Sequence, residues 1–191
     1  EDGKLIKTAV GTPQGSVASP LLANIFLHYV FDLWIQNWRD KHARGNIRVV
    51  RYADDIVIGC QRRDDSSKLK QALFERFAKF ELELHPEKTR LIEFGRFAAM
   101  HRRDCGETKP ETFNFLGFTH ICGFQKNNGQ FKVLRLSRRD RMKNKLHEIK
   151  RWLKLNMHAP IPEQGAYLRS VVQGWLNYHA VPGNNKAIRC F

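Results

Sequence analysis

A short predicted hairpin with two adjacent aspartates at its tip constrains the fold of this chain more than any other feature. β-Branched residues are frequent on both sides of Ala53-Asp54-Asp55, within residues 47–60, and such residues favour extended strands. Aspartate is common in turns, so an Asp pair alone says little. Two carboxylates held between buried strands, however, repel each other unless a cation is present. The spacing therefore fits a metal site and a plain turn equally well.

The chemistry of the aspartate pair narrows the choice of metal. Hard carboxylate oxygens on a rigid turn suit Mg²⁺. Neighbouring strand residues point to opposite faces, so Asp54 and Asp55 cannot surround a metal by themselves. A two-metal phosphoryl-transfer site needs a further carboxylate from another strand. Asp2 lies too close to the start of the sequence to be a convincing substitute.

The segments that flank the hairpin predict a mixed α+β fold. Ser19-Pro20 is typical of a helix start, and the apolar residues that follow recur at helical spacing, which predicts a heavily buried helix. Ser66 or Ser67 is expected to open a second amphipathic helix. The other expected elements are an extended stretch, a polar loop and two strands, at residues 82–94, 97–110, 113–118 and 130–136.

The character of the sequence changes at Ser137. Ser137 and Asp140 fit a capping box, and the helix expected after them is apolar on one face and basic on the others. A further helix is expected near residues 163–180. We therefore expect two domains, an α+β domain over residues 1–136 and a small helical domain over residues 137–191.

The charge of the chain favours a polyanionic partner. The sequence has 33 Lys and Arg against 19 Asp and Glu, a formal net charge of +14. Ten of these cations lie between Lys132 and Lys154, where only Asp140 and Glu148 oppose them. Neutralised phosphates release counterions, which drives such a surface towards nucleic acid. A solvated charged face is the alternative, and the uneven distribution disfavours it.

The cysteines and the apolar stretches bear on the cellular setting. The four cysteines show no CxxC spacing, and no secretory signal precedes them. We expect a reducing, cytoplasmic setting, in a bacterium or inside an organelle. The longest apolar-rich stretch, residues 21–35, is broken by polar residues and is too short to span a bilayer, so no membrane is expected as a partner.

A glycine-containing segment at residues 11–16 runs into the helix expected after Ser19. Glycines let a backbone approach a ligand closely, and a helix N-terminus favours anions, although a plain loop-to-helix joint has the same composition. With SPLLAN at 19–24 and YADD at 52–55, the segment resembles motifs B and C of reverse transcriptases of the group II intron (maturase) type. The resemblance continues in chain order through motif D, the motif E strand and the thumb (X domain), at residues 85–89, 113–118 and 174–184.

The resemblance implies a polymerase palm followed by a small helical thumb, with RNA-directed DNA synthesis as the activity, together with binding of the intron RNA and help in its splicing. A primer 3′-hydroxyl would attack the α-phosphate of a deoxynucleotide with two Mg²⁺ ions, for which Mn²⁺ could substitute. Asp54 and Asp55 would be catalytic metal ligands, with Asp54 the more important. Lys88 would stabilise charge at the leaving pyrophosphate or act as a general acid, although alone it fits a surface lysine after a proline turn.

The resemblance also implies binding roles. The residues implied to contact the nucleotide and the template are Pro13, Gln14, Gly15, Tyr52 and Ala53. The residues implied to form the primer grip are Phe115, Leu116 and Gly117. The residues implied to contact RNA or the duplex are Arg138, Arg139, Arg141, Lys143, Lys145, Lys150 and Arg151. The implied partners are an RNA template, an RNA–DNA duplex, group II intron RNA and deoxynucleoside triphosphates.

One part of the family pattern is missing from this sequence. The family places a fingers region and motif A before motif B, and the residues before Gly11 form neither. Motif A supplies a third aspartate and the residue that excludes a 2′-hydroxyl. We therefore expect the isolated chain not to extend a primer. No DNA-binding or endonuclease region is visible after the thumb, and the thumb itself is either complete or cut short at residue 191.

Three alternatives stay open at the level of sequence. The first is an RNA-binding splicing module without polymerase activity, which the missing motif A supports. The second is an RNA-templated RNA polymerase, against which YADD and the thumb resemblance argue. The third is a retron or diversity-generating reverse transcriptase, and the long thumb resemblance favours the intron type over it.

Overall fold

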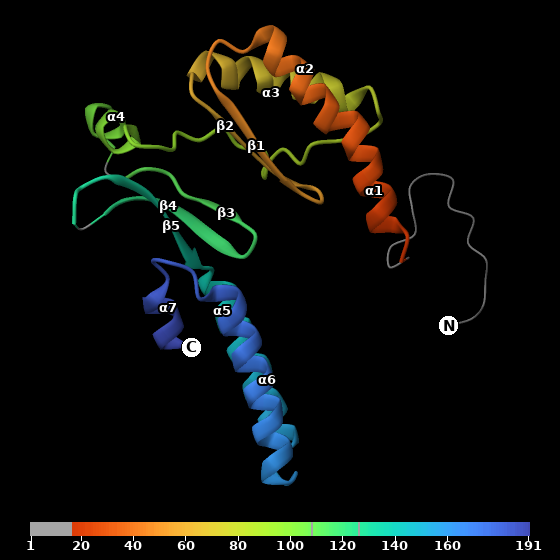
Figure 1. Cartoon of the computed structure of the whole chain (residues 1–191), viewed down its shortest axis with the longest axis vertical. Coiled ribbons are helices and arrows are strands. Elements are labelled where there is room, and N and C mark those ends of the chain that lie inside the picture. The colour runs from red at the N-terminus through yellow and green to blue at the C-terminus, as the bar shows by residue number, and fades with distance from the viewer. Residues whose placement is uncertain (1–16, 108, 126) are drawn as a thin grey trace. The chain divides into compact units, whose positions relative to one another are not determined.

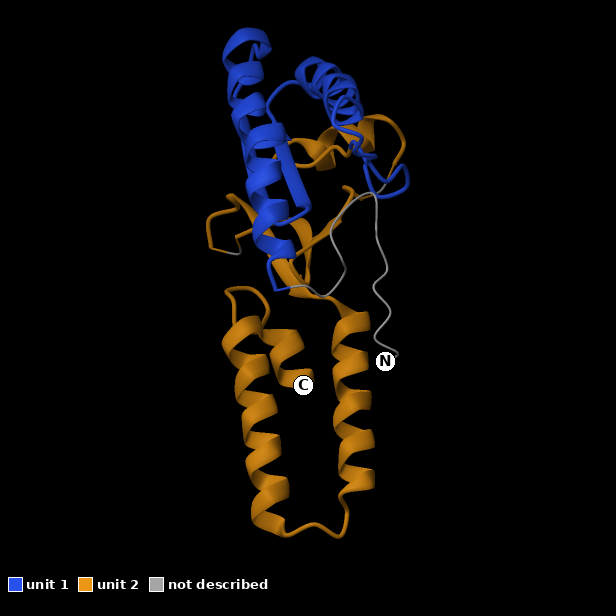
Figure 2. Cartoon of the chain, turned by 90° about the vertical axis from the view of Figure 1, so that its right-hand side faces the viewer, with its two compact units in different colours: residues 1–91 blue, residues 92–191 orange. Residues whose placement is uncertain are grey.

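The structure, a computed structural model, describes residues 17–107, 109–125 and 127–191 (Figure 1). The chain forms two compact units, of which the first ends at Leu91 and the second runs from Ile92 to Phe191 (Figure 2). Helices and antiparallel sheets occur together, which confirms the predicted α+β class. Among the helices of these residues, none has the length and apolar character that crossing a membrane requires.

The first unit combines a long helical stretch with a hairpin and one further helix. Its elements in chain order are α1 (Ser19–Leu27), the π-helical turn η1 (His28–Asp32), α2 (Leu33–His42), β1 (Ile47–Tyr52), β2 (Asp55–Cys60) and α3 (Arg63–Ala78). The antiparallel register of β1 and β2 runs from the pair Ile47 and Cys60 to the pair Tyr52 and Asp55. The predicted hairpin is therefore confirmed, with its tip at Ala53-Asp54.

The two faces of the hairpin have different surroundings. Ile47 is buried and Val49 packs against the same core, whereas Val50 and Tyr52 on the other face are exposed. The alternation follows from the period of two along a strand. The buried face meets a core formed by the helices, whose buried residues are Val30, Phe31, Ile35, Trp38, Leu69, Leu73 and Phe77. The hairpin thus has one face on the helices and one open face.

The first helix is in the predicted place, but the prediction that it is heavily buried is wrong for its first half. No residue of α1 is buried, and Leu21 and Ile25 are about half exposed at 64% and 48%. Burial begins at Val30 and Phe31, within η1. Helical spacing of apolar residues marks a face that can be buried, but it does not say which element covers that face.

The start of α3 also differs from the prediction. The helix begins at Arg63, before the expected Ser66 or Ser67, and the hydroxyl of Ser66 donates to the Arg63 carbonyl. Acidic residues at Asp64 and Asp65 occupy the first turn, where the positive end of the helix dipole stabilises them. The expected extended stretch at 82–94 forms no regular strand and is divided by a turn after His85.

The second unit holds a three-stranded sheet and a helical hairpin. Its elements are α4 (Ala98–Asp104), β3 (Phe113–Phe115), β4 (Phe118–Phe124), β5 (Phe131–Ser137), α5 (Arg139–Leu155), α6 (Ile161–His179) and α7 (Asn185–Cys190). The sheet is antiparallel in the order β3-β4-β5. Helices α5 and α6 run side by side, and the rings of Trp152 and Tyr167 stack between them at 3.7 Å (Figures 1 and 2).

Three expectations for this unit are corrected. The predicted loop at 97–110 contains α4 in its first half, because the residues AAMHRRD at 98–104 include strong helix formers. The predicted strand at 113–118 is broken by a two-residue turn at Leu116-Gly117, so that its last residue opens β4. The predicted capping box is absent, since the residue before α5 is Arg138 and Ser137 bonds elsewhere.

The predicted domain boundary near Leu136 lies inside the second compact unit, where β5 leads into α5. The sheet and the helices after it therefore pack as one body. A compact unit need not coincide with a functional domain. The expected domains 1–136 and 137–191 therefore stay a prediction.

Candidate functional site

The tip of the hairpin is a tight turn with an unusual backbone. Tyr52 and Asp55 face each other across the ladder, which leaves Ala53 and Asp54 as the two turn residues. Ala53 has a φ of 52°, a region that normally selects glycine at the first turn position. An L-residue pays roughly 1–2 kcal/mol for this conformation. Strain of this kind persists where surrounding structure enforces it, and it clusters at functional sites.

The two aspartates lie at an exposed place. Asp54 and Asp55 are both exposed, and Asp55 shares the open face of the hairpin with its cross-strand partner Tyr52. Their oxygens are the hard ligands that Mg²⁺ prefers. The residues that the structure describes contain no group of three or more His, Cys, Asp or Glu side chains placed to hold a metal ion. The pair thus fits part of a magnesium site and needs a further carboxylate.

Behind the turn, Arg51 lies on the buried face of β1 and makes several side-chain contacts. Its guanidinium donates to both carboxylate oxygens of Asp32, at 2.8 and 2.6 Å. It also donates to the Asn24 side chain at 2.9 Å and to the Ala53 carbonyl at 3.1 Å. Hydrogen bonds from Arg51 hold the pKa of the Asp32 carboxyl below its ordinary value.

The sequence reasoning missed Arg51 and Asp32 as site residues. A usable signal was present, because Ile47, Val49 and Arg51 occupy the same face of the expected strand. A charged residue in line with two apolar ones predicts a buried charge, and a buried charge needs a partner. The identity of that partner could not be predicted, because Asp32 reaches Arg51 only through the π-helical turn.

Two groups of predicted site residues have little structural support. Pro13, Gln14 and Gly15 lie outside the described residues, so their predicted role in nucleotide binding stays a prediction. Lys88 is exposed in the turn that follows His85, where the Thr89 amide donates to the His85 carbonyl at 2.9 Å. This position agrees with both interpretations of Lys88, the catalytic one and the surface one.

The predicted primer-grip residues form the turn between β3 and β4. Leu116 and Gly117 both have positive φ, 46° and 76°, which is typical of a type I′ hairpin turn. The Tyr178 hydroxyl of α6 donates to the Leu116 carbonyl at 2.8 Å, and the Arg138 amide donates to the Gly117 carbonyl at 3.1 Å. The turn is therefore held from α6 and from the residue before α5.

A buried polar network joins the sheet to the helices. The Ser137 hydroxyl lies 2.8 Å from Nδ1 of His179, and the Asn184 side-chain amide donates to that hydroxyl at 2.7 Å. Asn184 also donates to the His179 carbonyl at 2.8 Å and accepts from the Ser137 amide at 3.0 Å. Burial and the nearby charge of Arg141 lower the pKa of His179. The thumb-like sequence at 174–184 thus serves to fasten α6 to the end of β5.

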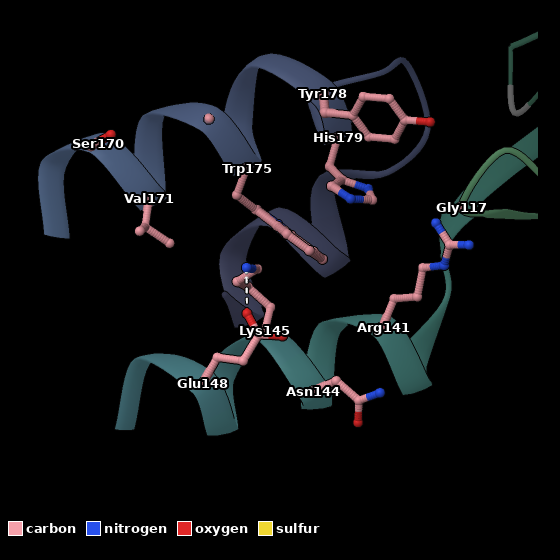
Figure 3. A pocket seen from close by; sticks show the side chains of 11 residues that line it. Gly117, Arg141, Asn144, Lys145, Glu148, Ser170, Val171, Trp175, Tyr178 and His179 are labelled. Atoms are coloured by element: carbon pink, nitrogen blue, oxygen red, sulfur yellow. Dashed lines mark hydrogen bonds and ion pairs between the residues drawn. The ribbon is translucent and has the colours of Figure 1, made fainter. Parts of the chain in front are cut away.

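The basic helix α5 borders an open pocket of about 560 Å³ between α5 and α6 (Figure 3). Arg141, Lys145 and Asn144 line it from α5, and Trp175 and Tyr178 line it from α6. Two of the seven predicted duplex-binding residues have acidic partners, since Arg138 pairs with Asp140 and Lys145 bonds Glu148 at 2.5 Å. The other five are exposed, namely Arg139, Arg141, Lys143, Lys150 and Arg151.

The family model described as reverse transcriptase (RNA-dependent DNA polymerase) matches residues 1–120, which is more than half of the chain. The matched range contains the hairpin with Asp54 and Asp55, the turn with Lys88 and the turn between β3 and β4. No curated protein matches the chain. The chain belongs to the reverse transcriptase (RNA-dependent DNA polymerase) family.

Proposed function

We propose that this chain is the palm and thumb of an RNA-directed DNA polymerase of the group II intron type. The observation that carries the proposal is the turn at Ala53-Asp54. In a member of this family, it presents two carboxylates on a strained backbone at the edge of an open sheet face. The intron type is supported by the thumb-like sequence at 174–184, whose Tyr178 bonds the β3–β4 turn.

The proposed reaction is phosphoryl transfer. The 3′-hydroxyl oxygen of a primer attacks the α-phosphorus of a deoxynucleoside triphosphate, and the bond from that phosphorus to the bridging oxygen breaks. Pyrophosphate leaves, and the proton of the hydroxyl passes to solvent or to a nearby base. Asp54 and Asp55 would hold divalent metal, and Mg²⁺ bound there would stabilise negative charge on the attacking and leaving oxygens.

The other residues of the site would bind and orient the substrates. The Tyr52 ring is exposed on the same face of the hairpin as Asp55, where it can contact a nucleotide or a template base. The turn at Leu116-Gly117, held by Tyr178, would support the primer strand. Lys88 would neutralise charge on the leaving pyrophosphate.

The exposed cations of α5 would follow the backbone of the RNA–DNA duplex. Five of the seven predicted residues are exposed and face no acidic partner in the described ion pairs. Each cation that neutralises a phosphate releases a counterion, so the binding should weaken steeply as salt rises. The same surface would bind group II intron RNA, which is the polyanion available to a splicing cofactor.

A second function is favoured by one observation. Within residues 17–107, 109–125 and 127–191, no third carboxylate joins Asp54 and Asp55. The chain by itself would then act as an RNA-binding splicing module without polymerase activity. The two functions predict different results when a segment carrying motif A is joined to the chain: a polymerase would then extend a primer, and a splicing module would not.

Primer extension on an RNA template in Mg²⁺ separates the two functions. The chain alone is compared with the same chain joined to a fingers segment that carries a motif A aspartate, and binding of structured RNA is measured for both. Extension by the joined protein only is the expected result. Tight RNA binding without extension by either protein would favour the splicing module, and robust extension by the chain alone would refute the need for a third carboxylate.

A further inference from the structure

The long helical stretch of the first unit contains a π-helical turn at His28–Asp32, between α1 and α2. A π turn shifts the hydrogen-bond pattern by one residue, and such turns are frequent at functional sites. Arg76 of α3 donates to two carbonyls of this turn, those of Val30 at 2.9 Å and Tyr29 at 3.4 Å. The Arg76 guanidinium also lies 4.4 Å from the centre of the Phe80 ring. The π turn is thus supported by a cation from another helix.

Asp32, the last residue of the π turn, faces the hairpin. Its two oxygens accept a two-pronged set of hydrogen bonds from Nε and Nη2 of Arg51. This arrangement fixes the orientation of the guanidinium as well as its position. The Arg51 side chain is only 14% exposed, so its charge depends on Asp32 for compensation. Without the π turn, Asp32 would point in another direction around the helix.

The third nitrogen of Arg51 reaches the strained residue. Nη1 donates to the Ala53 carbonyl at 3.1 Å and to Oδ1 of Asn24 at 2.9 Å. The Ala53 carbonyl belongs to the peptide that links Ala53 to Asp54. A hydrogen bond to this carbonyl therefore fixes the rotation of the peptide immediately before the first carboxylate.

We propose that Asp32, Arg51 and Arg76 form a positioning network that holds the turn at Ala53-Asp54 in its strained conformation and so aims the two carboxylates. Arg76 holds the π turn, the π turn presents Asp32, Asp32 orients Arg51, and Arg51 holds the Ala53 carbonyl. These are positioning residues, because the contacts that define the network are with other protein groups. Their effect on the turn stands by itself, and their effect on DNA synthesis rests on the proposed function.

A simpler role for Arg51 is to tie β1 to α1 and η1, through Asn24 and Asp32, with no effect on the turn. The two roles differ in whether the effect of removing Arg51 depends on the residue at position 53. Glycine adopts positive φ without penalty, so Ala53→Gly should leave the turn in place even when Arg51 is removed. A tie between β1 and α1 would be equally important with alanine or glycine at position 53.

The test uses nuclear magnetic resonance of the whole chain with Arg51→Gln, and with Arg48→Gln as the matched control. Arg48 is an exposed arginine on the opposite face of the same strand. Unchanged resonances of Trp38 and Leu69, both in the core and outside the π turn, establish that a variant is folded. Arg51→Lys serves as a second variant, because it keeps the charge but loses the two-pronged geometry.

The network predicts a specific change at the turn. In Arg51→Gln and Arg51→Lys, the strong cross-peak between the amide and α protons of Ala53, which marks positive φ, should weaken. Amide exchange at Tyr52 and Asp55 should accelerate about tenfold, because a hydrogen bond to a charged group is lost. Arg48→Gln should change neither. In the Ala53→Gly background, Arg51→Gln should leave the Asp54 and Asp55 resonances close to those of Ala53→Gly alone.

Equal displacement of the Asp54 and Asp55 resonances by Arg51→Gln in both backgrounds would overturn the proposal, as would an unchanged Ala53 cross-peak. A second measurement links the turn to synthesis. In the chain joined to a motif A segment, Arg51→Gln should lower kcat by a larger factor than it raises KM for the deoxynucleotide, because the bond that is lost holds the peptide before Asp54 and not the Tyr52 ring. If the joined protein has no activity, the proposed function fails while the resonance measurements still decide the role of the network.

Discussion

The buried network at Ser137, His179 and Asn184 should contribute several kcal/mol to the stability of the second unit, and Asn184→Ala tests this. Asn184 has no exposed surface, and its side chain takes part in three hydrogen bonds, with the Ser137 amide, the Ser137 hydroxyl and the His179 carbonyl. Alanine leaves the Ser137 amide buried and unpaired, which costs about 1–3 kcal/mol. The hydroxyl keeps His179 as a partner, so its loss is smaller. We expect a total of about 3 kcal/mol.

The assay is hydrogen exchange of the whole chain resolved to peptides from α6 and α7, across a denaturant series. The matched control is Asn156→Ala, because Asn156 makes one side-chain hydrogen bond, to the Trp152 carbonyl at 2.9 Å, at a partly exposed place. The control should lose about 1 kcal/mol or less. Two variants that are destabilised to the same extent would refute the reasoning that the network, and not a single hydrogen bond, fastens α6 to β5.

Three further expected outcomes concern the buried histidines, the strained turn and the exposed cations of α5. Burial lowers the pKa of His179 and of His120, so the unfolded chain binds protons more readily than the folded chain. The free energy of unfolding of the second unit should therefore be constant above about pH 7 and fall below about pH 6.5. His179→Gln should reduce this pH dependence, as measured by denaturant titrations. A rise in stability on acidification would contradict this. Ala53→Gly should stabilise the first unit by about 0.5–1 kcal/mol in denaturant titrations, because the gain from relieved backbone strain exceeds the entropy cost of glycine. Destabilisation would show that Ala53 is not strained. Removing one exposed cation of α5, by Arg139→Ala or Lys150→Ala, should reduce the slope of log K against log salt for RNA by about one, and an unchanged slope for both would exclude α5 from the interface.

Local features of the sequence predicted the hairpin and the positions of the long helices, but not the helix α4, the turn between β3 and β4 or the burial of the helices. The hairpin could be predicted because β-branched residues and a turn dipeptide favour the same structure within residues 47–60. The exposure of α1 could not, since periodicity does not identify the covering element. The turn at Leu116-Gly117 was missed because the apolar run at 113–118 fits a continuous strand as well as two strands of a hairpin.

In the candidate site, too, residues adjacent in sequence could be predicted, whereas contacts between distant residues could not. The aspartate pair could be predicted from sequence because the two residues are adjacent. The partners of the site come from distant positions, as Asp32 and Arg51 do across the π turn, or Ser137 and Asn184 across 47 residues. Ser137 fits a helix cap by its spacing to Asp140, but its hydroxyl instead bonds His179, which only the fold brings near.

The central claim is that Asp54 carries catalysis of DNA synthesis, and single-nucleotide incorporation tests it most directly. The chain joined to a motif A segment is compared with its Asp54→Asn variant, and with Asp64→Asn, an exposed aspartate of α3, as the matched control. We expect Asp54→Asn to lower the incorporation rate about a hundredfold or more, because charge developing on the transferring phosphoryl group loses its electrostatic stabilisation. Asp64→Asn should leave the rate unchanged. Incorporation by Asp54→Asn at the rate of the unmodified protein would contradict the account.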